Sequence, residues 1–167
     1  MARVNGQLWD ITRPLEGEEC SLELLKFDSP EGKQVFWHSS AHILGLALEL
    51  RYHQTASDAA PQAEEDVLLC DGPALKEEDG GGGFFYEFFL PTKEGHATTA
   101  SSDDFPSIQQ LIASVLKDRH PFQRMKVSKE LALSMFAHNK FKLYVSRSAT
   151  LHSNTQSHTL RTFVGRS

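Results

Sequence analysis

The chain has 167 residues, of which 40% are hydrophobic and 23% charged, and its formal net charge at pH 7 is −5. This length suits one ordinary domain or one domain with part of another, and the negative charge excludes a global basic field for nucleic acid while leaving room for a local RNA-binding patch. Two cysteines make no disulfide framework, no apolar run is long enough for a membrane span, and the first residues lack a signal core. We therefore expect a protein of a reducing, soluble compartment.

The first 28 residues predict short strands. Asn5-Gly6 is a two-residue turn typical of type I′ hairpins, and residues 22–27 form a second apolar strand. Residues 29–33, with their proline and glycine, predict a polar linker. So short a segment buries too little surface to be stable alone. It is expected to pack on the rest of the chain, or to be the tail of a domain whose front is missing.

A histidine pair marks the next segment, which predicts a helix from residue 34 to about Tyr52. Residues four apart lie above one another on a helix, so His38 and His42 share one face with Gly45 and Glu49. The opposite face is apolar. Gly45 has no side chain, so a ligand or a backbone could approach the histidine face closely.

Three interpretations of the histidine pair stay open. The commonest for any His-x-x-x-His is a half-buried pair satisfied by local hydrogen bonds. The pair could also be half of a zinc site, since i, i+4 histidines chelate zinc, or a metal-free acid–base pair. Ser39 stands where a zinc protease has glutamate, and neither Cys20 nor Cys70 supplies a second ligand pair. We therefore predict that this chain has no metal site. If zinc nevertheless binds, His38 and His42 are the expected ligands.

The middle of the chain predicts loops around two strands. Residues 53–66 read as a solvated loop, and residues 66–70 as a short buried strand. The glycine run ends in Phe84 rather than the Gly-Lys-Ser/Thr of a phosphate-binding loop, so it predicts a flexible hairpin loop. Residues 84–90 carry aromatic side chains on both faces, which predicts a strand central in a sheet.

The last third alternates between helices and strands. Asp103-Asp104 and Pro106 are typical of a helix start, apolar residues recur at helical spacing to Leu116, and Pro121 ends the helix. The remaining predictions are a strand at 122–127, a helix capped by Ser128, a strand at 141–146 and a loosely attached tail.

In this order, the segments from residue 4 to residue 146 resemble the front of a threonyl-tRNA synthetase. The motifs that resemble the end of its TGS domain are Val4-Asn5-Gly6-Gln7-Leu8-Trp9-Asp10, Arg13-Pro14-Leu15 and Leu22-Glu23-Leu24-Leu25-Lys26-Phe27. Those that resemble its editing domain are Trp37-His38-Ser39-Ser40-Ala41-His42-Ile43-Leu44-Gly45, Cys70-Asp71-Gly72-Pro73, Gly83-Phe84-Phe85-Tyr86, Asp104-Phe105-Pro106, Pro121-Phe122, Val127-Ser128-Lys129-Glu130, Met135-Phe136 and Asn139-Lys140-Phe141-Lys142. Each motif is modest, and their order makes the resemblance specific.

The resemblance implies an α+β fold in three parts. Residues 1–28 would be the C-terminal part of a β-grasp TGS domain, and residues 34–146 an incomplete editing domain of the threonyl/alanyl-tRNA synthetase type, with an antiparallel sheet and helices. Residues 147–167 would be a weakly structured tail. Extra residues at 54–65 and 74–82 would lengthen two loops.

The resemblance also implies a function. The parent family is a cytoplasmic, homodimeric ligase that attaches threonine to its tRNA using ATP. Its editing domain hydrolyses seryl-tRNA made in error, because one methyl group gives only about 1–3 kcal/mol of discrimination. The expected catalytic residues are His38, His42 and, on a later strand, Lys142. They would orient the terminal ribose and help to position or activate a water.

The sequence departs from this family in what it does not contain. It holds no Cys-x-x-x-His segment to complete the editing site and no ligase core, to which the ATP site, the zinc and the dimer contact belong. We therefore expect a fragment, a truncated product or a gene whose predicted ends are wrong, without a cofactor of its own. Alone it should deacylate seryl-tRNA poorly or not at all.

Two other functions stay open. The first is a non-catalytic remnant that binds tRNA or protein, for which tRNA binding would survive loss of both His38 and His42. The second is a zinc-dependent hydrolase related to stand-alone aminoacyl-tRNA deacylases, for which purified protein would hold stoichiometric zinc.

Overall fold

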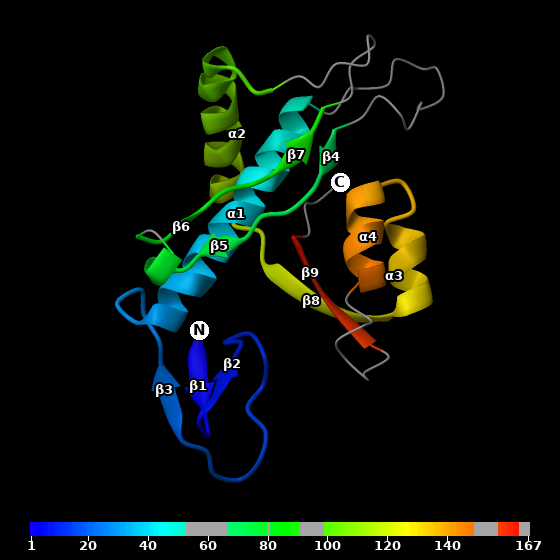
Figure 1. Cartoon of the computed structure of the whole chain (residues 1–167). Helices are drawn as coiled ribbons and strands as arrows, with labels where there is room; N and C mark the ends of the chain where they lie inside the picture. Colours follow the sequence, from blue (N-terminus) through cyan, green and yellow to red (C-terminus); the bar gives the residue numbers. More distant parts are fainter. Residues whose placement is uncertain (53–66, 80, 91–98, 149–156, 164–167) are drawn as a thin grey trace. The chain divides into compact units, whose positions relative to one another are not determined.

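A computed structural model describes residues 1–52, 67–79, 81–90, 99–148 and 157–163, with helices and antiparallel strands in the order that Figure 1 labels. The chain divides into two compact units, each described by itself. Unit 1 comprises Met1–Ala41 with Gly72–Phe85, and unit 2 comprises His42–Asp71 with Tyr86–Ser167. Within the described residues, every helix is too short or too polar to span a bilayer.

Unit 1 begins with a three-stranded antiparallel sheet in the order β2-β1-β3. Its strands are β1 (Ala2–Val4), β2 (Gln7–Trp9) and β3 (Leu22–Leu24). The predicted turn is confirmed, since Asn5 and Gly6 have φ angles of +49° and +79°, as a type I′ hairpin requires. Asn5 also accepts a hydrogen bond of 2.8 Å from the Ser21 amide through its side-chain oxygen, which fastens β3 to the turn.

Helix α1 (Pro30–Tyr52) starts earlier than the sequence predicted. The Ser29 hydroxyl accepts a hydrogen bond of 3.1 Å from the Gly32 amide, as an N-cap residue does. Pro30 then occupies the first helical position, where its lack of an N–H costs nothing. The interpretation of residues 29–33 as a linker is therefore wrong, because serine followed by proline is here a helix start.

A small hairpin completes unit 1. Its strands β5 (Ala74–Leu75) and β6 (Gly83–Phe84) pair in antiparallel fashion around the 3-10 helix η1 (Glu77–Asp79). The Lys33 ammonium, from α1, forms an ion pair of 2.6 Å with Glu77.

The residues on either side of this hairpin belong to unit 2. There, β4 (Leu68–Leu69) pairs with β7 (Phe88–Phe89). The expected continuous strand over residues 84–90 is therefore wrong: it is two short strands with different partners, and each lies in a two-stranded ladder rather than at the centre of a sheet.

The core of unit 2 lies between α1 and α2 (Phe105–Asp118). Its buried members are Ala47, Leu48 and Ile108. A 3-10 turn η2 (Ser102–Asp104), capped by Ser101, leads into α2, which ends where Arg119 adopts a left-handed φ of +51°. The predicted helix and its acidic start are confirmed, although it ends before Pro121 reaches it.

The rest of unit 2 is a long hairpin and a pair of helices. Strand β8 (Phe122–Ser128) pairs along its whole length with β9 (Ser157–Phe163), while α3 (Lys129–Met135) and α4 (Lys140–Ser148) pack side by side (Figure 1). The Ser128 cap is confirmed, with a hydrogen bond of 3.2 Å from the Leu131 amide.

Two predictions for this region are corrected. Residues 141–146 belong to a helix rather than a strand, and residues 157–163 of the expected loose tail form a strand. The predicted loops at 53–66 and the residues at 149–156 and 164–167 lie outside the described residues. The mixture of helices and antiparallel strands confirms the α+β class, whereas the TGS and editing domains and their boundaries stay predictions.

Candidate active site

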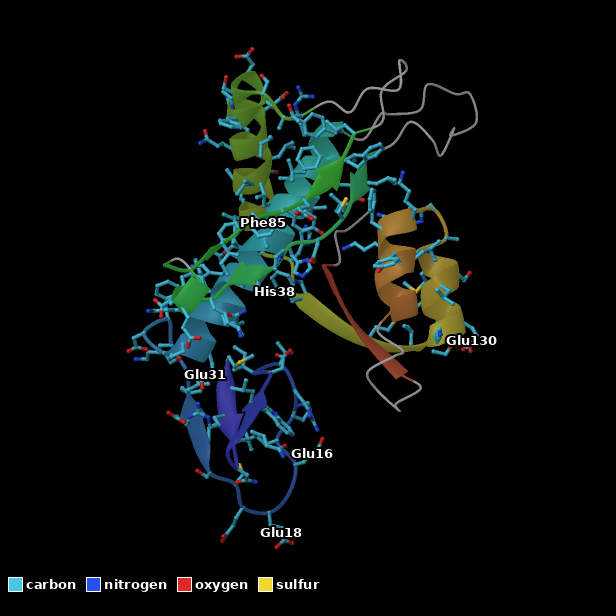
Figure 2. All side chains as sticks on the ribbon, viewed as in Figure 1. Glu16, Glu18, Glu31, His38, Phe85 and Glu130 are labelled. Carbon is cyan, nitrogen blue, oxygen red and sulfur yellow. The ribbon has the colours of Figure 1, made fainter. Side chains whose placement is uncertain are left out.

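The predicted site begins on one face of α1. Helical spacing places His38, His42, Gly45 and Glu49 in line, and Figure 2 labels His38 on this helix. Both histidines are half-buried, whereas Gly45 is buried. The division between the two units falls between Ala41 and His42. His42, Gly45 and Glu49 therefore belong to unit 2, whereas His38, one helical turn earlier, belongs to unit 1.

Gly45 is covered by an aromatic ring of the same unit. A Cβ atom placed on Gly45 would lie 2.5 Å from Cε2 of Tyr86, closer than any real contact, so the tyrosine ring rests on the bare helix backbone. The centroids of the Tyr86 and His42 rings are 6.4 Å apart in an edge-on arrangement. Another group does approach Gly45 closely, as its lack of a side chain predicted. In the described chain this group is the Tyr86 side chain, rather than a ligand or a backbone segment.

The hydrogen bonding between the β4 and β7 segments is irregular next to Tyr86. The Cys70 amide donates a hydrogen bond of 2.8 Å to the Glu87 carbonyl, and the Glu87 amide donates one of 2.7 Å to the Asp71 carbonyl. Two residues of one strand therefore oppose one of the other, which is the pattern of a β-bulge. A bulge redirects the side chains beside it, and Tyr86 directly precedes the residue at which this one occurs.

Lys142 reaches the same group of residues from α4. Its ammonium interacts electrostatically with Asp71 and Cys70 at the end of β4 and with Glu49 on α1. Tyr86 interacts with the same three residues. Lys142 thus interacts with a residue of the helix that carries His42, and it does so from a helix rather than from the predicted strand.

Burial sets the protonation of this group. It raises the pKa of Tyr86 to about 12, with Asp71 and Glu49 adding to the effect, so this phenol is neutral at pH 7. Burial also raises the pKa of Cys70, with Glu87 as the second cause, so its thiol is protonated and a poor nucleophile. The pKa of Lys142 is lowered, chiefly by burial, against the opposing attraction of Asp71, Cys70 and Glu49.

Sequence reasoning missed a buried polar residue at the start of α4. Asn139 is 5% exposed, and its side-chain amide donates a hydrogen bond of 2.9 Å to the Leu69 carbonyl on β4. Its side-chain oxygen accepts hydrogen bonds of 3.0 Å each from the amides of Phe141 and Lys142, the start of α4. Asparagine before a run of helix-compatible residues is an N-cap signal, which could have indicated the helix.

No three histidine, cysteine or acidic side chains in the described part of the chain converge as a metal site would require. His38 and His42 alone would give a zinc ion two of the three or four protein ligands that it takes. Zinc binding by this pair therefore stays an alternative that needs ligands from elsewhere.

The depressed pKa of Lys142 predicts how this residue affects stability. Because burial disfavours its charge, the unfolded chain binds more protons than the folded chain in the pH range between the lowered pKa and the usual value of 10.5. The free energy of unfolding therefore rises as the pH increases through that range. We expect Lys142→Met to be more stable than the unaltered chain at pH 7, and this difference to shrink towards pH 10.

Urea unfolding at both pH values measures this effect. Lys117→Met serves as the control, since Lys117 is an exposed lysine of α2 in the same unit. A Lys142→Met chain that is less stable than the unaltered one at pH 7 would show that attraction by Asp71 and Glu49, and not burial, dominates.

Comparisons with known proteins place this segment. No family model matches the chain. It is 42% identical over 142 residues to the cytoplasmic threonine–tRNA ligase 2 of Homo sapiens, covering 85% of this chain and 15% of that protein. It is also 42% identical over 145 residues to the cytoplasmic threonine–tRNA ligase of Caenorhabditis elegans, covering 87% and 17%. Over this segment, the chain is similar to cytoplasmic threonine–tRNA ligases.

A third relative extends the same result to fungi. The cytoplasmic threonine–tRNA ligase of Saccharomyces cerevisiae is 40% identical over 148 residues, which cover 87% of this chain and 18% of the relative. The chain therefore spans less than a fifth of the length of these threonine–tRNA ligases. The resemblance to threonyl-tRNA synthetases that the motifs indicated is confirmed, while the roles of His38, His42 and Lys142 stay predictions.

Proposed function

We propose that this chain carries part of the hydrolytic proofreading site of a threonine–tRNA ligase, which removes serine from threonine-specific tRNA. One observation carries the proposal. Lys142, far from the histidine helix in sequence, interacts with the same three residues as Tyr86, whose ring lies on Gly45 beside His42. The similarity to threonine–tRNA ligases supports it. A ligase for threonine has to discriminate against serine, which differs from threonine by one methyl group.

The chemistry of the proposed site is ester hydrolysis. A water molecule attacks the carbonyl carbon of the seryl ester, the bond to the ribose oxygen breaks, and that oxygen takes up a proton. An imidazole titrates near neutral pH, so His42 and His38 are suited to orient the ribose and to accept or return a proton. A charged lysine such as Lys142 would stabilise negative charge that develops on the carbonyl oxygen.

The proposed partner follows from this substrate. It is threonine-specific tRNA carrying serine at its terminal ribose, and binding must be local because the chain carries a net charge of −5. Attachment of threonine with ATP belongs to the proposed function of the whole ligase rather than to these residues. The relatives are named cytoplasmic, and we propose the same location for this chain.

Binding of a stable substrate analogue tests the proposal without requiring turnover. The probe is adenosine with serine attached at its 3′ carbon through an amide, which cannot be hydrolysed at the ester position. We expect the chain to bind it, and His42→Ala and Lys142→Ala each to weaken binding by about tenfold or more, since a hydrogen bond to a charged group contributes about 1.5–3 kcal/mol. The threonyl analogue should bind at least about tenfold more weakly.

Two exposed residues provide matched controls. His138→Ala and Lys117→Ala remove the same types of side chain from exposed positions and should leave binding unchanged. Equal affinity for the seryl and threonyl analogues, or equal loss in the control variants, would contradict the proposal. tRNA binding that survives the double change of His38 and His42 would instead support a non-catalytic role.

Hydrolysis of seryl-tRNA itself gives a second measurement. We expect this chain alone to release serine slowly or not at all, because its sequence holds no Cys-x-x-x-His segment. Rapid release that His38→Ala abolishes would show that the residues present suffice for catalysis.

A further inference from the structure

Asn139 joins two parts of unit 2 that are distant in sequence. Its side-chain oxygen accepts hydrogen bonds from the first amides of α4, and its side-chain nitrogen donates to the Leu69 carbonyl on β4. The Asn139 carbonyl also accepts a hydrogen bond of 3.0 Å from the Leu143 amide. The side-chain oxygen and the side-chain nitrogen of Asn139 thus each have a partner inside the protein, where an unpaired amide would be costly.

The consequence concerns Lys142, which lies in the first turn of α4. An N-cap fixes where a helix starts, and a bond from the same side chain to β4 fixes where that start lies relative to the strand. The residues after Leu69 are Cys70 and Asp71, which interact electrostatically with Lys142. We propose that Asn139 is a positioning residue, which holds the Lys142 ammonium at the end of β4 by capping α4 and bonding to Leu69 at once.

The surroundings of Lys142 support this assignment. Among the described residues, Glu49 on α1 and Cys70 and Asp71 at the end of β4 act electrostatically on Lys142. The start of α4 also contacts β7 through aromatic rings, since the centroids of Phe141 and Phe89 are 5.9 Å apart. The inference deepens the proposed function, on which the role of Lys142 towards a substrate rests, but the placement of Lys142 can be tested by itself.

The decisive variant is Asn139→Ser. Serine is a good N-cap and preserves the acceptor for the amides of α4, but its side chain is too short to reach Leu69. Ser128→Ala is the matched control, because it removes a cap from α3 that has no bond to β4 in the described structure. The pair thus separates the effect of the bond to Leu69 from that of capping.

Titration of Lys142 is the readout, since a purely stabilising residue would not move it. The lysines are dimethylated with 13C and observed by NMR, and the Lys142 signal is identified by its loss in Lys142→Arg. In the unaltered chain we expect Lys142 to titrate below the exposed lysines. In Asn139→Ser its pKa should rise towards theirs, whereas Ser128→Ala should leave it unchanged.

Two results would overturn the inference. One is a Lys142 titration that Asn139→Ser leaves unchanged, and the other is a change in Ser128→Ala as large as in Asn139→Ser. Should Asn139→Ser fail to fold, hydrogen exchange of the Asn139 side-chain amide in the unaltered chain decides: slow exchange is expected, and exchange as fast as in free asparagine overturns the inference.

Binding of the seryl analogue keeps the two proposals apart. If both stand, Asn139→Ser weakens binding about as much as Lys142→Ala, about tenfold or more. If Lys142→Ala leaves binding unchanged while the titration of Lys142 responds to Asn139→Ser, the proposed function fails and the positioning role stands.

Discussion

Replacing Gly82 by alanine should lower the free energy of unfolding of unit 1 by about 2–5 kcal/mol. Gly82 has a φ of +79°, which costs an alanine about 1–2 kcal/mol. A Cβ there would also lie 2.0 Å from Cη2 of Trp37, so the indole must move. Movement of that ring disturbs its edge contact with Phe27, whose centroid is 6.2 Å away, and forcing extra volume into a packed contact costs about 1–3 kcal/mol more.

The neighbouring glycine is a close control. Gly81 has a similar φ of +94°, but nothing lies within 4 Å of a Cβ placed there. Gly81→Ala should therefore show the cost of the backbone angle alone. Both tryptophans of the chain, Trp9 and Trp37, lie in unit 1, so tryptophan fluorescence during urea unfolding follows this unit. Equal destabilisation by the two changes would show that the Trp37 contact contributes nothing.

Alanine at Gly45 should destabilise unit 2 only while Tyr86 is present. In a helix, alanine is more favourable than glycine by about 1 kcal/mol. Here, however, a Cβ would lie within 2.5–2.9 Å of three atoms of the Tyr86 ring. We expect Gly45→Ala to be destabilising in the unaltered chain and stabilising by about 1 kcal/mol in a Tyr86→Ala background, because the obstruction is then gone.

The four chains of this comparison form a double-mutant cycle. Circular dichroism during urea unfolding gives the free energies, and the coupling between Gly45 and Tyr86 should amount to about 1–3 kcal/mol. The Tyr86→Phe background serves as the control, since it retains the ring and should retain the destabilisation. A zero coupling energy would mean that the ring does not lie on Gly45, and the shared surroundings of His42 and Lys142 would lose their main support.

Signals confined to a few neighbouring residues predicted the structure well. The Asn5-Gly6 turn, the acidic start of α2 and the Ser128 cap each depend on hydrogen bonds or backbone angles that the residues themselves favour. The Ser29-Pro30 start of α1 carried such a signal too, although it was interpreted as a linker.

Segments whose partners are remote were predicted less well. Phe141, Leu143 and Val145 alternate with other residues, a pattern that fits a strand, but the Asn139 cap makes the segment a helix. Residues 84–90 have the composition of one strand, yet two different strands, β5 and β4, pair with its two ends. Strand pairing depends on which other segment is near, and no local pattern contains that information.

At the candidate site, the histidine face of α1 could be predicted from residue spacing, because helical geometry alone aligns His38, His42, Gly45 and Glu49. The resemblance to the threonine–tRNA ligases could be predicted as well, from an ordered series of motifs. The folded structure was needed to show that Tyr86 covers Gly45 and that Asn139 connects the start of α4 to β4 beside Lys142. Those contacts join residues that are distant along the chain, and they exist only when packing and buried hydrogen bonds outweigh the entropy lost in bringing such segments together.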